Sequence, residues 1–489
     1  MPFKESTNEG TQQILENVME IQFGLKESDK QFQNKFRLIF GDCLTTLRLH
    51  AFKTERSLEL DPYERLDWLL PVFGLWHLRF NYAQLLYEHH FVGPNGEHDS
   101  SAMYEPFSNW YDSKSLNPKH FRKVEALIIQ TWQSKMTAIL MQIWFDEHDG
   151  KIPEKPDLQN WIERLPQNEL TKLVKRIMKW FDKDCLGKPD GERDEEWCNH
   201  INFVRNTLPF LTLQAAIKHA DIGVLRHAIN ECCLLFSGTK RNWLYTRELL
   251  YYKWLTDSPA SDKRLQRAVL YNSLVNPHGS SNTYYEEDNS VEELNLVVKT
   301  LMRNKRTSSQ DLITLLQRYT HNIKFFQRQR KAFSKAFFPA PKGYKPSKLA
   351  DSQIFIYALI LVKDGKIKEI PRTSIFQTQD LMTVGLDKLY DKVEQFNDFL
   401  TNTGIRKMRT PAENIALQNE LGGHRGEGGI TEEEIRGIVE ADAVDTDSDS
   451  GHSSDLEIEL EDLEREDYLH EYESDILDID AQETFSESD

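Results

Sequence analysis

Apolar residues recur every three or four positions over most of residues 119–275, and this period predicts a run of amphipathic helices. The pattern places helices at 121–148, 158–181 with a break at Pro166, 208–238 with an end at Gly238, 246–255 and 263–275. Further helices are expected at 11–25, 286–306, 309–333 and 380–400. The periodicity therefore predicts a chain that is mainly helical.

Two short apolar runs interrupt this pattern near the start of the chain. Phe36–Phe40 is followed by Gly41 and Asp42, which predicts a buried strand that ends in a turn. Leu69–Leu75 is a second run, and it leads directly into a segment of helical period. Residues 93–118 are polar and are expected to form a loop. The fold class predicted is mainly α with a small mixed α/β core.

Charge is distributed unevenly along the chain. Residues 431–489 hold 24 of the 78 acidic residues and 2 of the 60 basic residues, which leaves 54 acidic and 58 basic residues in 1–430. The formal net charge of -18 therefore comes from the tail, and the rest of the chain is slightly basic. The tail has too few apolar residues to offset the entropy of ordering, so we expect it to be disordered.

These patterns predict five parts: an N-terminal helix and disordered start at 1–34, a strand–helix–strand part of the α/β core at 35–92, a helical insertion at 93–280, the helical remainder of the core at 281–403, and a disordered acidic tail at 404–489. There is no CxxC pair among the five cysteines, and no secretory signal opens the chain. The longest apolar run, Ile354–Val362, is too short to span a bilayer. We expect an intracellular protein, nuclear or cytoplasmic, with no membrane partner.

Asp42 is the first candidate for chemistry. A carboxylate at the end of a buried strand is held in place by the sheet while the turn stays open to solvent, which suits metal-dependent chemistry. The simpler interpretation is that Asp42 caps the helix that follows. Local sequence favours the cap over the metal-binding interpretation.

A second candidate is the helix that begins near Asp288. Asp288, Glu292, Asn295 and Lys299 are spaced by four, three and four residues, which stacks them in one polar stripe. Two carboxylates at this spacing can share a hard cation such as Mg²⁺ or Mn²⁺. A charged stripe is also typical of any surface helix, and Asp288 near the helix start suits the helix dipole.

Three sequence elements resemble a large fungal family known as a domain of unknown function. They are a GD-x-L-T element at Gly41–Thr45, a PV-x-G-L-x-H element at Pro71–His77, and an E-x-D-xxx-E-x-L-N element at Glu286–Asn295. The elements occur in the family's order, and the resemblance covers most of residues 35–400. It implies membership of this family but no established activity.

The same order of elements is similar to that of ribonuclease-H-like transposase domains. The similarity implies a partial ribonuclease-H-like core with a large helical insertion, in which Asp42, Asp288 and Glu292 bind Mg²⁺ or Mn²⁺ for phosphodiester cleavage. It makes His77 and Asn295 further candidates. It also implies an earlier strand with a first catalytic aspartate, which residues 1–34 do not provide. We therefore expect either that the natural chain begins earlier than Met1 or that the protein is a decayed or repurposed relative of such a nuclease.

Two hypotheses for function follow. The first is a transposase-derived DNA-binding protein, degenerate or active as a metal-dependent nuclease. The basic and aromatic segments 240–245 and 322–333 favour it. The second is a non-enzymatic interaction protein whose acidic tail binds basic proteins. The chain has no P-loop, GxGxxG, GxSxG or HExxH motif. The sequence therefore gives no support for a kinase, dehydrogenase, hydrolase or metalloprotease function.

Overall fold

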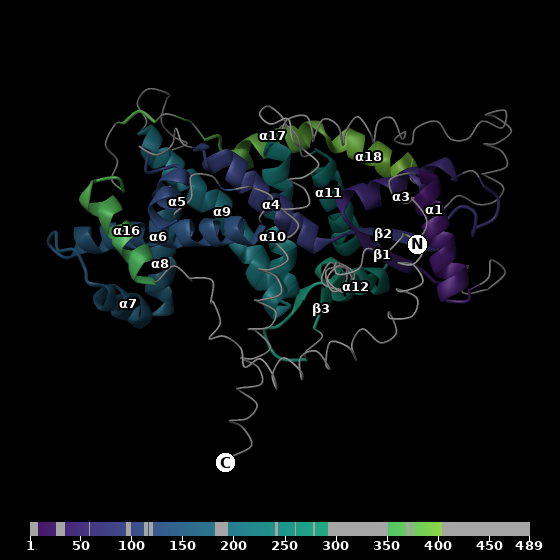
Figure 1. Ribbon diagram of the computed structural model, residues 1–489, viewed down its shortest axis with the longest axis horizontal. Coiled ribbons are helices and arrows are strands. Elements are labelled where there is room, and N and C mark those ends of the chain that lie inside the picture. Colours follow the sequence, from purple (N-terminus) through teal and green to yellow (C-terminus); the bar gives the residue numbers. More distant parts are fainter. Residues whose placement is uncertain are drawn as a thin grey trace, which may run out of the picture. The chain divides into compact units, whose positions relative to one another are not determined.

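The computed structural model describes residues 8–25, 35–57, 59–93, 99–111, 116, 121–180, 194–239, 243–259, 261–276, 279–291, 351–367, 372–374, 376 and 378–402. This part of the chain is mainly helical, as the periodicity predicted (Figure 1). It includes the α17 and α18 helices near its end, at Leu381–Asp391 and Val393–Asn402. The chain divides into two compact units.

The smaller unit comprises residues 1–15, 289–348 and 432–489, and most of helix α1 (Asn8–Glu16) is its main described element. The larger unit comprises residues 16–288 and 349–431. It begins with the end of α1 and a π-helical segment, η1 (Asn17–Gln22), and it holds all the other helices and strands described below.

Two parallel strands begin the larger unit's main body. Strand β1 (Arg37–Gly41) leads into helix α3 (Cys43–Glu55), and strand β2 (Leu69–Phe73) leads into helix α4 (Leu75–His90). The strands pair in parallel with Gly41 opposite Phe73. Every residue of β2 is buried, which is typical of a parallel strand covered on both faces. Both predicted strands are confirmed, although the residues of β1, which were expected to be buried, are only partly buried.

The remaining helices are α5 (Tyr104–Trp110), α6 (Phe121–Glu147), α7 (Lys155–Arg164), α8 (Gln167–Trp180), α9 (Glu195–His219), α10 (Ile222–Gly238), α11 (Trp243–Asp257), α12 (Lys263–Asn272) and α16 (Asp351–Lys363). A short antiparallel hairpin, β3 (Leu274–Val275) with β4 (Tyr285–Glu286), follows α12. The predicted break at Pro166 separates α7 from α8, and α10 ends at Gly238 as expected.

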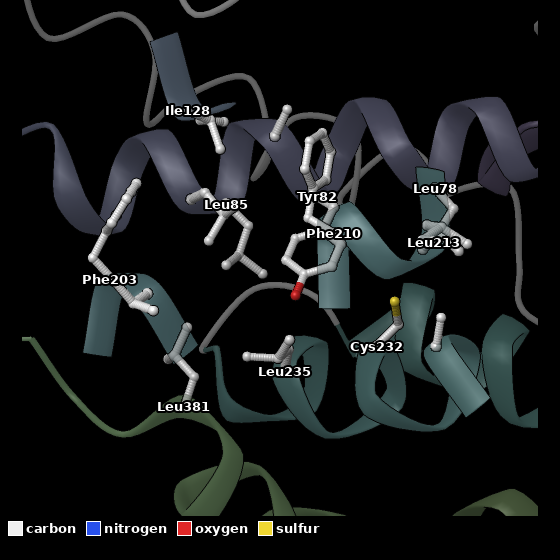
Figure 2. Packing of buried hydrophobic residues seen from close by; sticks show 14 of the residues in the cluster. Leu78, Tyr82, Leu85, Ile128, Phe203, Phe210, Leu213, Cys232, Leu235 and Leu381 are labelled. Atoms are coloured by element: carbon white, nitrogen blue, oxygen red, sulfur yellow. The ribbon is translucent and has the colours of Figure 1, made fainter. Parts of the chain in front are cut away.

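The hydrophobic core lies among α4, α6, α9 and α10. Figure 2 shows Tyr82 and Leu85 of α4 directed toward side chains of α9 and α10. Tyr82 is fully buried, and its hydroxyl donates a hydrogen bond of 2.7 Å to the carbonyl of Asn206 on α9. The polar end of this tyrosine is therefore satisfied while its ring fills the core.

Helices α10 and α17 cross with almost no space between their backbones. A Cβ atom on Gly385 would lie 1.8 Å from the Leu234 carbonyl oxygen, and one on Gly238 would lie 2.2 Å from the Leu381 carbonyl oxygen. The Ser237 hydroxyl contacts the Gly385 carbonyl at 2.8 Å across the crossing. Glycine at both positions permits this close approach.

Two predictions were partly wrong. Residues 104–110, inside the expected loop 93–118, form helix α5, because Tyr104 and Phe107 pack into the core. The predicted helix 263–275 ends earlier than expected, because Leu274 and Val275 pair with β4 as strand β3. The predicted helix 309–333 and the tail lie outside the described residues, as does most of 286–306. Among the described helices, none combines the length and apolar character needed to cross a bilayer.

Candidate functional site at the edge of the parallel strand pair

Asp42 is the N-cap of α3. Its Oδ1 accepts a hydrogen bond of 2.7 Å from the Thr45 backbone N–H, which satisfies one of the free donors in the first turn. A Cβ atom on Gly41 would lie 2.8 Å from Thr45 Cγ2, so the glycine leaves room for the threonine side chain. The GD-x-L-T element is thus a compact strand-to-helix turn, and the capping interpretation is confirmed.

Asp288 caps a helix that lies more than 200 residues earlier in the chain. Its carboxylate accepts hydrogen bonds from the backbone N–H groups of Trp76 at 3.0 Å and His77 at 3.1 Å. It also contacts His77 Nδ1 at 3.0 Å. Gly74, the residue that precedes α4, has no side chain to cap it. The negative charge at the helix N-terminus is favourable, because the helix dipole is positive there.

The close approach of Asp288 depends on glycine at position 74. A Cβ atom there would lie 2.2 Å from Asp288 Oδ2. We call Gly74, Trp76, His77 and Asp288 together the Asp288 clasp. The clasp joins two of the sequence elements, PV-x-G-L-x-H and E-x-D, through direct contacts between them.

Asp42 and the start of the Asp288 clasp lie at the same edge of the strand pair, where both strands have their carboxyl ends. Gly41 lies opposite Phe73, so Asp42 and Gly74 are the residues that directly follow the two parallel strands, and the Gly74 N–H donates a hydrogen bond of 2.8 Å to the Gly41 carbonyl. The carboxyl ends of parallel strands are the usual place for ligand and catalytic groups in open α/β sheets. The three sequence elements therefore meet at one edge of the sheet.

A buried ion pair lies close to the clasp in sequence. Glu286, two residues before Asp288, lies 3.2 Å from Arg79 Nε of α4, and both side chains are at least nine-tenths buried. The contact between Arg79 Nε and the Glu286 carboxylate does not have the geometry of a hydrogen bond, so it is an electrostatic contact between two charged groups. Burial raises the pKa of Glu286, and the charge on Arg79 opposes that shift. Glu125 of α6 is a second, more distant partner of Arg79 at 3.8 Å.

Removing the Asp288 carboxylate is expected to destabilise the fold measurably. Asp288→Ala leaves two N–H groups at the start of α4 without an acceptor, and we expect the free energy of unfolding to fall by about 1–3 kcal/mol. Asp288→Asn keeps an acceptor oxygen and should lose less. Chemical denaturation measures both. The exposed Asp387→Ala is the control and should leave stability unchanged; equal effects of all three variants would contradict a capping role.

The described residues do not assemble a divalent-cation site. Within them, no group of three or more His, Cys, Asp and Glu side chains is placed to hold a metal ion. Both Asp288 oxygens already accept N–H groups. Glu292 and Asn295, the other members of the predicted stripe, lie outside the described residues. We therefore derive no metal-dependent step from this edge.

A second polar cluster is buried between α6 and α9. Ser100 Oγ donates to Glu196, so the 3.2 Å contact with His200 requires that His200 Nε2 be the donor. Nδ1 of His200 then carries the lone pair, so His200 cannot accept the serine proton. Burial lowers the pKa of the nearby Lys135 to about 7. The cluster therefore lacks the hydrogen bond from serine to histidine that would activate Ser100 as a nucleophile.

The fold and this edge define a class of protein: a mainly helical chain with a small parallel strand pair, whose strand ends carry acidic helix caps. The chain belongs to the family described as "Family of unknown function (DUF6589)", whose model matches residues 1–345. No curated protein and no solved structure matches the chain. The predicted membership of a domain-of-unknown-function family is thereby confirmed.

The sequence pointed to Asp42, His77 and Asp288 as candidates and to the cap at Asp42, but it did not indicate the contact between His77 and Asp288. The periodicity of the segment after Glu286 favoured a stripe on one helix, whereas Asp288 points to the start of α4. The available signal was Gly74, because a helix that begins after glycine lacks a side-chain cap of its own. The Arg79–Glu286 ion pair had no comparable signal.

Proposed function

We propose that this chain is a nucleic-acid-binding protein derived from a transposase, and that its former catalytic edge now serves to hold the fold together. The observation that supports this most is the parallel pairing of β1 with β2, which brings Asp42 and His77 to one edge, where His77 contacts Asp288. The order of strand, aspartate, second strand, W-H helix, helical segment and late acidic residues resembles the middle part of ribonuclease-H-like transposase domains, without the earlier strand and its first aspartate.

The use of the carboxylates favours binding over cleavage. Asp42 and Asp288 accept backbone N–H groups of α3 and α4, so both are engaged as caps. A two-metal nuclease needs its carboxylate oxygens directed at the ions. The proposed protein thus keeps the scaffold of a nucleic-acid enzyme, and affinity comes from the slightly basic charge of residues 1–430.

The test is DNA binding by the full chain as a function of salt. We expect binding at about 50 mM salt whose logarithmic affinity falls linearly with the logarithm of salt concentration. We expect no cleavage in the presence of Mg²⁺ or Mn²⁺. Absence of binding, both by the full chain and after removal of the tail, would leave the non-enzymatic interaction protein as the better proposal. If the chain cleaves DNA and Asp42→Asn abolishes this cleavage, the hypothesis of an active nuclease would be supported instead.

Removing residues 431–489 is expected to strengthen DNA binding. The segment carries 24 acidic and 2 basic residues, so it repels phosphates and competes with them for cationic side chains. The gain should be largest at about 50 mM salt and should shrink at about 0.5 M, where charges are screened over a few ångströms. Equal affinities with and without the tail at low salt would contradict this prediction.

A further inference from the structure

One exposed face of α12 combines cations with an aromatic ring. Lys263, Arg267 and Tyr271 are spaced by four residues each, so they follow one another along the same side of the helix. All three are exposed, and Tyr271 is 69% exposed. The opposite side is anchored in the core through Val269 and Leu270. The exposed side is called the α12 stripe below.

The charges of the α12 stripe are available to a ligand. Within the described residues, neither Lys263 nor Arg267 forms an ion pair, whereas the neighbouring Arg264 is held by Asp262 at 3.2 Å. A step of four residues advances roughly 6 Å along a helix. That spacing is short enough for long lysine and arginine side chains to reach successive phosphates of one strand.

The stripe adjoins the hairpin that leads to the Asp288 clasp. Tyr271 lies two residues before Ser273, and the Ser273 carbonyl accepts a hydrogen bond of 3.1 Å from the Glu287 N–H. Helix α12 packs against β3 (Figure 1). A strand bound along the stripe would therefore run toward the segment that carries Asp288.

We propose that the α12 stripe binds single-stranded nucleic acid, with phosphates on Lys263 and Arg267 and a base stacked on Tyr271. The inference rests on the proposed function and adds the surface and the form of the nucleic acid. An exposed ring can stack only on a base that is not already stacked in a duplex, which favours a single strand. Cations supply the affinity that depends on salt.

Helix α8 provides a matched comparison. It exposes Lys175 and Lys179 on one face with Val174 and Met178 as exposed neighbours, and none of the helix's described side chains on this face is aromatic. A lysine pair alone provides charge but no surface on which a base can stack. The combination of cations with an aromatic ring in one row distinguishes α12 from α8.

The experiment measures binding of the full chain to a fluorescent single strand of about 16 nucleotides and to a duplex of the same length. For the single strand, Lys263→Ala with Arg267→Ala should reduce the salt slope by about 1.4, because two phosphate contacts are lost. Tyr271→Ala should weaken binding about tenfold, and Tyr271→Phe should restore most of it. The control Lys175→Ala with Lys179→Ala removes the same charge and should leave the affinity nearly unchanged.

The outcomes separate the two proposals. If the wild-type chain binds and the stripe variants bind equally well, the α12 stripe is wrong and the proposed function stands. If neither the wild-type chain nor the chain without residues 431–489 binds single strand or duplex, both proposals fail. Preference for duplex with no effect of Tyr271→Ala overturns the stripe. The stripe is also overturned if polyglutamate competes with the single strand as well as unlabelled nucleic acid does and Tyr271→Ala has no effect. The surface would then suit acidic proteins.

Discussion

Replacing Gly385 with alanine is expected to detach α17 from α10 and to lower the free energy of unfolding by about 3 kcal/mol. The added methyl group would lie 1.8 Å from the Leu234 carbonyl oxygen, which is backbone of a packed helix and cannot move aside alone. The helices must separate, and the Ser237 contact with the Gly385 carbonyl is then lost. Denaturant unfolding gives the free-energy change, and hydrogen exchange over 380–402 locates it.

The chain provides a matched control on the partner helix. Gly223 lies in the first turn of α10, where the nearest atom to an added Cβ is Asp221 Oδ1 at 3.4 Å. Gly223→Ala should be neutral or slightly stabilising, because alanine restricts the unfolded chain and has the higher helix propensity. Equal stabilities of the Gly385→Ala and Gly223→Ala proteins would contradict the close helix crossing.

Glu286→Ala is expected to cost about 3–5 kcal/mol, because it leaves the buried Arg79 without its nearest negative partner. The guanidinium would then depend on Glu125, whose oxygen lies 3.8 Å from Arg79 Nε and also accepts from Gln214. If Arg79 still pairs with Glu125, the loss of unfolding free energy should lie at the lower end of that range.

A double variant separates the ion pair from simple loss of packing. Arg79→Met combined with Glu286→Met removes both charges and keeps most of the volume, so it should recover much of the stability that Glu286→Ala loses. The exposed pair of Lys172 and Glu169 is the control, and Glu169→Ala should change stability by less than about 1 kcal/mol. If the double variant is as unstable as Glu286→Ala, the charge on Arg79 is not the cause.

These two predictions concern contacts of different origin. The glycine at 385 matters because two backbones approach each other, and the glutamate at 286 matters because it balances a buried charge. Neither contact could be deduced from local sequence. Gly385 lies within a segment of ordinary helical period, and Glu286 stands among other acidic residues that precede Asp288.

The proposed α12 stripe has a spacing that is present in the sequence but not distinctive. Lys263, Arg267 and Tyr271 have helical spacing, yet such spacing also describes many buried or paired side chains. The structure shows that all three are exposed, and that the cation at 264 is paired while those at 263 and 267 form no ion pair within the described residues. The two basic segments favoured from sequence, 240–245 and 322–333, lie largely outside the described residues.

Local patterning by itself determined the helical character of this chain, the two strands and the cap at Asp42. Those features depend on neighbours within four residues, so periodicity and a Gly-Asp pair suffice to predict them. Only the tertiary structure decided that Asp288 caps α4. Its partners lie 211 and 212 residues away, and nothing in either segment alone specifies the other. Packing brings them together, because β3 and β4 pair and place Asp288 beside a helix start that glycine leaves open.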